Sequence, residues 1–150
     1  MASEDNPRVF LPPPLIFGGL LALGLLLDSD PLRFGPVSIG GLVLAVGGVV
    51  LIGIAFGLFR ASGTRAEPWQ PSSSLVDRGL YRFTRNPMYL GMALLSLGIA
   101  IAFTSLTGVF LALAALLIID RAVVTREEAY LKRRFGQDYV AYMARVRRWL

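Results

Sequence analysis

The stretch Val37–Phe59 constrains this chain most, because its 23 residues contain no charged side chain. At ~1.5 Å per residue it forms a helix about 35 Å long, enough to cross a hydrocarbon core of about 30 Å. Further apolar stretches lie at about 14–27, 87–103 and 105–124. The sequence therefore predicts an all-α integral membrane protein, a single domain built as a bundle of four transmembrane helices.

The composition excludes several kinds of site. The 150 residues include no Cys and no His, which excludes disulfides, thiol nucleophiles, Cys/His zinc sites and triads built on imidazole. We expect no metal. Hydrophobic residues make up 55% of the chain and charged residues 17%, against roughly a quarter charged in a soluble domain. This balance favours a membrane over nucleic acid as the partner, despite a net charge of +5.

The distribution of charge predicts the orientation. The loop at 60–86 carries five arginines and the tail from Asp120 carries eight basic residues, whereas the 28–36 loop carries one and the 104–107 turn none. The positive-inside rule places the basic segments in the cytoplasm. Four spans then put both termini on that side of the cytoplasmic (inner) membrane. The start of the chain has no basic region typical of a signal peptide.

The C-terminal residues 125–150 are predicted to form an amphipathic helical cap on the cytoplasmic side. Their apolar side chains recur at spacings of three or four, and Gly136 is expected to divide the segment into two helices. Such a segment lies on the bilayer surface or caps the bundle. Its basic residues suit anionic lipid headgroups. The apolar positions are Leu131, Phe135, Tyr139, Tyr142, Val146 and Trp149.

Small residues in the predicted spans indicate close helix packing. Gly53 and Gly57 have the GxxxG spacing, which lets two helix backbones approach each other. The pair forms either a homodimer face or a contact within the bundle, and we favour the second interpretation. The oligomeric state is thus monomer or homodimer.

Three polar clusters exceed what a membrane anchor needs. The first is the loop at 60–86, which is too long for a simple connection. Its prolines and Trp69 predict an ordered segment with Ser72–Ser74 as its flexible tip. The alternative is a solvated linker.

The second cluster is Arg85–Gly91, with the sequence RNPMYLG. Asn86 is the expected N-cap of a helix and Pro87 its first residue. The free N–H groups of that helix end, together with Arg85, suit an anionic group such as a carboxylate. Tyr89 lies one turn inside, and Gly91 leaves space where a ligand could lie.

The third cluster is Arg126-Glu127-Glu128, just beyond the fourth apolar stretch. Adjacent carboxylates at a membrane boundary are costly unless they are paired or used. Helical spacing offers pairs of Glu128 with Lys132 and of Glu127 with Arg134. The other interpretation is that one carboxylate faces a cavity and binds a cationic ligand.

In this order, the clusters resemble the isoprenylcysteine carboxyl methyltransferase and phospholipid methyltransferase superfamily of small integral membrane enzymes. The resemblance covers about Gly63 to Leu150. It consists of LVDRGLYRFTRNPMYLG at 75–91, the Glu pair at 127–128 and FGQDYVAYMARVRRWL at 135–150. In that family Arg-His-Pro-x-Tyr-x-Gly opens a transmembrane helix, and the tail folds over the cofactor. This chain departs from the motif at Asn86, which excludes a titrating imidazole there.

The resemblance implies S-adenosylmethionine as cofactor and S-adenosylhomocysteine as product. One of Glu127 and Glu128 would hold the methionine ammonium, and Arg85 with the helix N-terminus its carboxylate. Arg145 would bind an anionic acceptor, and Tyr89, Tyr139 and Tyr142 would line the adenosine or methyl site. The implied cofactor-binding set is Arg85, Asn86, Pro87, Tyr89, Gly91, Glu127, Glu128, Tyr139 and Tyr142, with Arg145 and Tyr89 as catalytic residues.

The expected reaction is methyl transfer to a lipophilic acceptor that enters from the bilayer. Without His, only Asp, Glu or Tyr could deprotonate an ammonium acceptor, which favours a carboxylate or thiol over an amine. Two alternatives are a membrane reductase of the sterol type, which uses NADPH, and a non-catalytic membrane bundle protein.

Overall fold

The computed structural model describes residues 11–31, 34–63 and 73–150, and every regular element in this part of the chain is helical. This confirms the all-α class. The elements are α1 (Pro13–Asp28), α2 (Pro36–Ala61), η1 (Gly79–Arg82), α3 (Pro87–Ala102), α4 (Leu106–Ile118), η2 (Ile119–Val124), α5 (Thr125–Phe135) and α6 (Gln137–Arg145).

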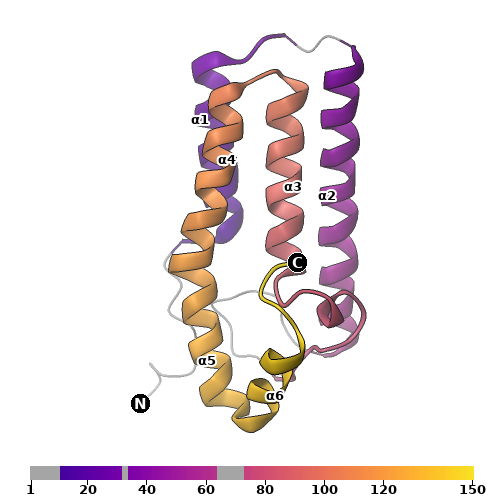
Figure 1. Cartoon of the computed structure of the whole chain (residues 1–150), viewed down its shortest axis with the longest axis vertical. Helices are drawn as coiled ribbons and strands as arrows, with labels where there is room; N and C mark the ends of the chain where they lie inside the picture. The colour runs from indigo at the N-terminus through magenta and orange to yellow at the C-terminus, as the bar shows by residue number, and fades with distance from the viewer. Residues whose placement is uncertain (1–10, 32–33, 64–72) are drawn as a thin grey trace.

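The four helices α1 to α4 run alternately up and down, and α3 lies in the middle (Figure 1). It contacts α2 on one side and α4 on the other, and α1 packs against both α4 and α3. The start of α3, the end of α2 and the C-terminus lie at the same end of this arrangement (Figure 1). We call this end of α3, residues 84–89, the foot of α3.

Local sequence explains where the helices begin and end. Proline occupies the first turn of α1, α2 and α3, where its missing N–H costs nothing. The first helix begins at Pro13, one residue before the expected Pro14. The predicted hairpin between α3 and α4 is confirmed: α3 ends at Ala102, and the Ser105 side chain caps α4 by accepting a hydrogen bond from the Gly108 N–H.

Glycines bring α2 and α3 into close contact. A Cβ on Gly98 would lie 2.4 Å from the backbone nitrogen of Ala45, and a Cβ on Gly48 would lie 2.6 Å from the carbonyl oxygen of Gly91. The favoured interpretation of Gly53 and Gly57 as a contact within the bundle is wrong, because a Cβ on either would meet nothing within 4 Å. The glycines that do pack lie on the opposite face of α2.

The outer faces of the helices are apolar. Two helices are long and apolar enough to cross a membrane, Pro36–Ala61 and the continuous Leu106–Phe135. Only 17% of the most apolar stretch of the first is buried within the protein. The helices α1 and α3 have 16 residues each, about 24 Å, so the count of four spans stays a prediction. Exposed apolar side chains include Leu26, Val43, Val46, Ile54, Phe110 and Leu117.

The C-terminal part of the chain turns back to the foot of α3. After α4 the helix continues through the π-helical turn η2 into α5, which extends beyond the bundle (Figure 1). Gly136 ends α5 with φ +56°, as the sequence predicts, and α6 follows in another direction. The last residues, 146–150, which we call the terminal segment, lie beside the foot of α3, where the Arg85 N–H donates to the Arg147 carbonyl at 2.9 Å. The predicted order around Trp69 falls outside the described residues.

Candidate functional site

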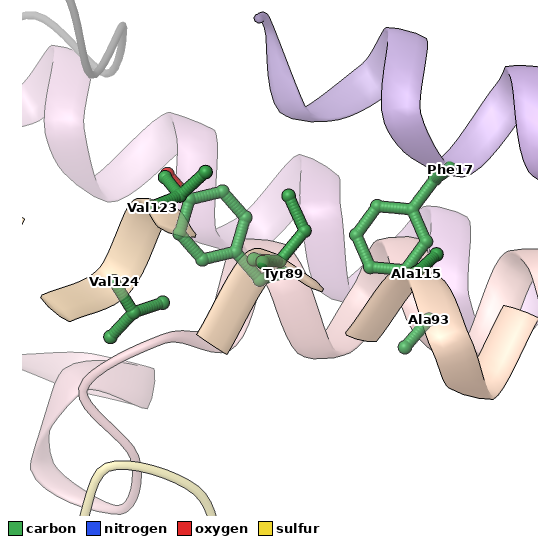
Figure 2. Packing of buried hydrophobic residues seen from close by; sticks show 7 residues of the cluster. Phe17, Tyr89, Ala93, Ala115, Val123 and Val124 are labelled. Carbon is green, nitrogen blue, oxygen red and sulfur yellow. The ribbon is translucent and has the colours of Figure 1, made fainter. Parts of the chain in front are cut away.

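Tyr89 and Glu127 meet at the foot of α3. The Tyr89 hydroxyl donates to Glu127 Oε1 at 2.7 Å, which joins the first turn of α3 to α5. The Tyr89 ring is buried beside Val123, in an apolar cluster that includes Phe17 and Ala115 (Figure 2). The apolar contacts fix the ring, and the hydroxyl therefore reaches the carboxylate from a fixed position.

Glu128 forms a different set of contacts, although it is the adjacent residue. Its Oε1 lies 2.7 Å from the Arg85 guanidinium and its Oε2 lies 2.6 Å from that of Arg148. Arg148 also donates through Nε to Glu128 Oε1 at 3.1 Å. The Glu128 side chain is only 8% exposed, and burial of a carboxylate is tolerated when it is paired in this way. The expected pair of Glu128 with Lys132 is therefore wrong, because two arginines from elsewhere in the chain hold it.

Arg85 connects this carboxylate to the terminal segment. One terminal nitrogen donates to the carbonyl oxygens of Val146 at 2.9 Å and Met143 at 3.2 Å, and the other binds Glu128. The side chain is 10% exposed, and among the described residues its Nε is a buried nitrogen without a hydrogen-bond partner. A buried donor without a partner costs about 1–3 kcal/mol, so this nitrogen is a candidate for binding a ligand.

Asp120 holds the end of the terminal segment. Its Oδ1 accepts from Arg148 at 3.1 Å and from the Trp149 indole N–H at 3.0 Å. Arg148 thus bridges Asp120 and Glu128, which lie on one helix. Asp120 Oδ2 also lies 3.3 Å from the exposed Arg121, so three arginines and two carboxylates form this network.

Glu127 is partly buried and its electrostatic situation is different. Burial raises its pKa from the usual 4.5 to about 7, the hydrogen bond from Tyr89 acts against this rise, and the nearby charge of Glu128 adds to it. Glu128 has two arginine partners, whereas Glu127 accepts a hydrogen bond from a neutral phenol, that of Tyr89. Glu127 is therefore the carboxylate of the pair that a cation would stabilise most.

Asn86 occupies the N-cap position of α3, as predicted, but its side chain makes no capping hydrogen bond. Its Nδ2 instead donates to the Arg148 carbonyl oxygen at 3.0 Å, and the Thr84 hydroxyl donates to the same atom at 3.0 Å. Pro87 follows as a fully buried first residue of α3. Both motif residues thus shape the foot of α3 and its contact with the terminal segment.

Tyr139 and Tyr142 form the core of α6. They are 2% and 3% exposed, and their ring centroids are 5.9 Å apart. The Tyr142 hydroxyl donates to the Tyr81 carbonyl oxygen at 2.7 Å, which ties α6 to η1. Burial raises the pKa of both phenols. A contact of either with a cofactor stays a prediction.

Gly91 and Arg145 are two further predicted site residues. The space beside Gly91 belongs to α2, because a Cβ there would lie 2.7 Å from Ile52 Cγ1 and 2.9 Å from the Gly48 carbonyl oxygen. The interpretation that Gly91 leaves room for a ligand is therefore wrong. Arg145 has a 67% exposed side chain, and its guanidinium lies 3.9 Å from Asp77. Its role toward an acceptor stays a prediction.

The sequence reasoning missed Asp120, Arg148 and Trp149 as parts of the site. An acidic residue at the end of a long apolar helix was a usable signal for Asp120, because such residues are costly unless paired. Arg148 lies within the quoted motif at 135–150, but nothing in the spacing of the tail distinguishes it from its basic neighbours.

Comparison with known proteins shows which family the chain belongs to. Residues 37–138 match the family Phospholipid methyltransferase, a stretch that covers more than half of the chain and includes both Arg85–Gly91 and the Glu127-Glu128 pair. Over 67 residues the chain is 39% identical to a Haemophilus influenzae protein described as uncharacterized; this match covers 42% of this chain and 100% of that protein. No solved structure matches the chain significantly. The chain therefore belongs to the phospholipid methyltransferase family, which indicates a membrane methyltransferase.

Proposed function

We propose that this protein crosses the cytoplasmic membrane four times and uses S-adenosylmethionine to methylate a lipophilic acceptor at the cytoplasmic face. The foot of α3, with its arginines, lies on the cytoplasmic side in this proposal. The arginine-rich loop and tail support that orientation, and the apolar outer faces of α2 and α4 support contact with lipid.

The observation that carries the proposal is the division of roles within the Glu pair. Glu128 forms ion pairs with Arg85 and Arg148. Glu127 instead accepts a hydrogen bond from a neutral hydroxyl, and its pKa is raised. A partly buried carboxylate of this kind favours a cationic ligand, because the cation offsets the cost of its ionised form. We assign Glu127 to the methionine ammonium of the cofactor and Glu128 to the fold.

The unpartnered Nε of Arg85 fits the other end of the amino acid moiety. It is a buried cationic donor whose neighbouring nitrogens are already occupied, so an approaching carboxylate would complete its hydrogen bonds without breaking the Glu128 pair. A charge-assisted bond of this type is stronger than a neutral one. The Arg85 guanidinium therefore suits the carboxylate of an amino acid, as the Glu127 carboxylate suits its ammonium.

The bound cofactor would supply a methyl group on a positively charged sulfur, which an acceptor displaces in line. The protein's own contribution is alignment and the exclusion of water. Tyr89 is fixed by its apolar neighbours and directs its hydroxyl at Glu127, and Trp149 packs against the same apolar cluster. These contacts limit the motion of the carboxylate that orients the ligand.

The acceptor enters from the bilayer in this proposal, and we favour a carboxylate or a thiol. Such a group needs no base once it is ionised, and the chain has no His. If Glu127 binds the ammonium, it is not available as a base.

A second candidate acceptor is the amine of a phospholipid headgroup. The family description favours it, and so does the pKa of Glu127 near 7, since a general base works best with a pKa near the working pH. Labelled S-adenosylmethionine with vesicles that contain phosphatidylethanolamine, or with a prenylated carboxylate, separates the two acceptors by the lipid that becomes labelled.

Thermal unfolding of the purified protein in detergent tests the proposed cofactor. A ligand that binds only the folded state raises the melting temperature. We expect S-adenosylhomocysteine to raise it and NADPH to leave it unchanged. Protection by NADPH alone supports a reductase of the sterol type, and protection by neither ligand supports a non-catalytic bundle protein.

A further inference from the structure

Asp120 is a charged residue near the end of a long apolar helix, and its side chain is only 17% exposed. Its Oδ1 accepts from two consecutive residues of the terminal segment, Arg148 and Trp149. A residue that served only solubility at the end of the helix would point to water. The contacts of Asp120 point instead to the terminal segment.

The π-helical turn η2 contains Asp120 and precedes Glu127. A turn of this kind inserts one residue into the helix, which rotates all later side chains by about 100° relative to a regular helix. Such turns often occur at functional sites. Asp120, within the turn, contacts the terminal segment, and Glu127 and Glu128, beyond it, contact residues at the foot of α3 or in the terminal segment.

We propose that Asp120 is a positioning residue for the cofactor site. It holds Arg148 and Trp149, Arg148 in turn holds Glu128, and Glu128 holds Arg85. The inference rests on the proposed function, because the groups that Asp120 positions are those we assign to the cofactor. Three ion pairs in series link Asp120 to Arg85: Asp120–Arg148, Arg148–Glu128 and Glu128–Arg85. Asp120 acts on Arg85 only through these pairs.

The charge of Asp120 explains how its loss would affect the binding of a cationic ligand. Three arginines face two carboxylates in the network, and loss of the Asp120 charge increases the excess of positive charge around Glu128, the chain neighbour of Glu127. That excess disfavours a cationic ligand. It also releases the indole of Trp149, which packs against the cluster that contains Tyr89. Both effects weaken the binding of the methionine moiety.

The test uses Asp120→Ala and Asp120→Asn in the full-length protein with Trp69→Phe, so that Trp149 is the one remaining tryptophan. Fluorescence quenching by acrylamide reports the exposure of Trp149, and calorimetry measures the affinity for S-adenosylhomocysteine. Asp120→Asn keeps the side-chain volume. It replaces Asp120→Ala in the same measurements if Asp120→Ala does not fold. The exposed Asp138→Asn controls for loss of a carboxylate. Gly98→Ala, at the α2–α3 contact, controls for loss of stability alone.

We expect Asp120→Ala to increase the quenching of Trp149 and to weaken S-adenosylhomocysteine binding by about tenfold, the lower end of what loss of an outer contact costs at metal sites. Asp120→Asn should have a smaller effect in the same direction, and both controls should bind as the wild type does. If wild type and Asp120→Ala bind S-adenosylhomocysteine equally tightly, the inference about Asp120 is overturned, but the proposed function is not. A wild type that does not bind S-adenosylhomocysteine overturns the proposed function, and the inference with it.

Discussion

Glu127 is expected to make cofactor binding depend on pH near neutrality. Its side chain is partly buried, and this burial raises the pKa to about 7, against the effect of the hydrogen bond from Tyr89. We assign the ionised form to the methionine ammonium. A protonated Glu127 offers no charge to that ammonium, so binding at low pH must first remove a proton.

The size of the effect follows from the pKa. At pH 6.0 about 90% of a group with a pKa near 7 is protonated, and at pH 7.5 about a quarter is. The ionised fraction, and with it the apparent affinity, therefore rises about eightfold between the two values. The Glu127→Gln variant should bind more weakly at both pH values and show no such rise.

Isothermal titration with S-adenosylhomocysteine at pH 6.0 and 7.5 measures this change. Asp138→Asn serves as the control, because it removes an exposed carboxylate and should keep the full pH response. An affinity of the wild type that is the same at both pH values, or a Glu127→Gln variant that keeps the eightfold rise, refutes the assignment of Glu127.

The same pKa also predicts a change in stability. Because the pKa of Glu127 is higher in the folded state than its usual 4.5, the folded protein binds more protons between these values. The contribution of Glu127 to the free energy of unfolding falls by roughly 3 kcal/mol as pH rises from about 4.5 to about 7. Above pH ~7 this contribution is constant. Glu127→Gln should abolish this dependence in urea unfolding.

Three further predictions concern single substitutions. Gly98→Ala should lower the free energy of unfolding by about 1–3 kcal/mol, because its Cβ would lie 2.4 Å from a backbone nitrogen of α2; an unchanged urea midpoint contradicts the close packing. Tyr89→Phe should move the pH midpoint of S-adenosylhomocysteine binding upward, because the hydroxyl lowers the pKa of Glu127, and a downward move contradicts this. Hydrogen bonds, the largest from Ser105, lower the pKa of Asp28, so its contribution to stability is present above pH ~4 and lost below it; Asp28→Asn should flatten the stability curve in acid, and an unaltered curve excludes this role.

The sequence predicted the helices well because its signals are local. The apolar stretches, the prolines at helix starts and the break at Gly136 all appear where expected. Each depends on backbone rules that a few neighbouring residues satisfy. The packing faces were harder to predict. Gly53 and Gly57 have the same spacing that packs helices elsewhere, yet they lie on the outer face of α2, because only the full set of contacts decides which glycines meet another helix.

The candidate site shows the same limit. The Glu pair and Arg85 were found by their motif, but the sequence could not divide the roles of Glu127 and Glu128. That division depends on Arg148, which is 20 residues from Glu128 along the chain and reaches it because α6 reverses the chain direction. Periodicity along one helix suggested Lys132 as the partner of Glu128, and long-range ion pairs replaced it.

The central claim is that Glu127 binds the cofactor and Glu128 holds the fold. Calorimetric titration with S-adenosylhomocysteine, together with urea unfolding of Glu127→Gln and Glu128→Gln at pH 7.5, tests it most directly. Removing one partner of a buried ion pair costs about 3–5 kcal/mol, so Glu128→Gln should lose stability of this order. Glu127→Gln should be at least as stable as the wild type at pH 7.5, because it removes a carboxylate whose raised pKa costs stability there, and it should lose binding. A Glu127→Gln variant that binds S-adenosylhomocysteine as tightly as the wild type contradicts the claim.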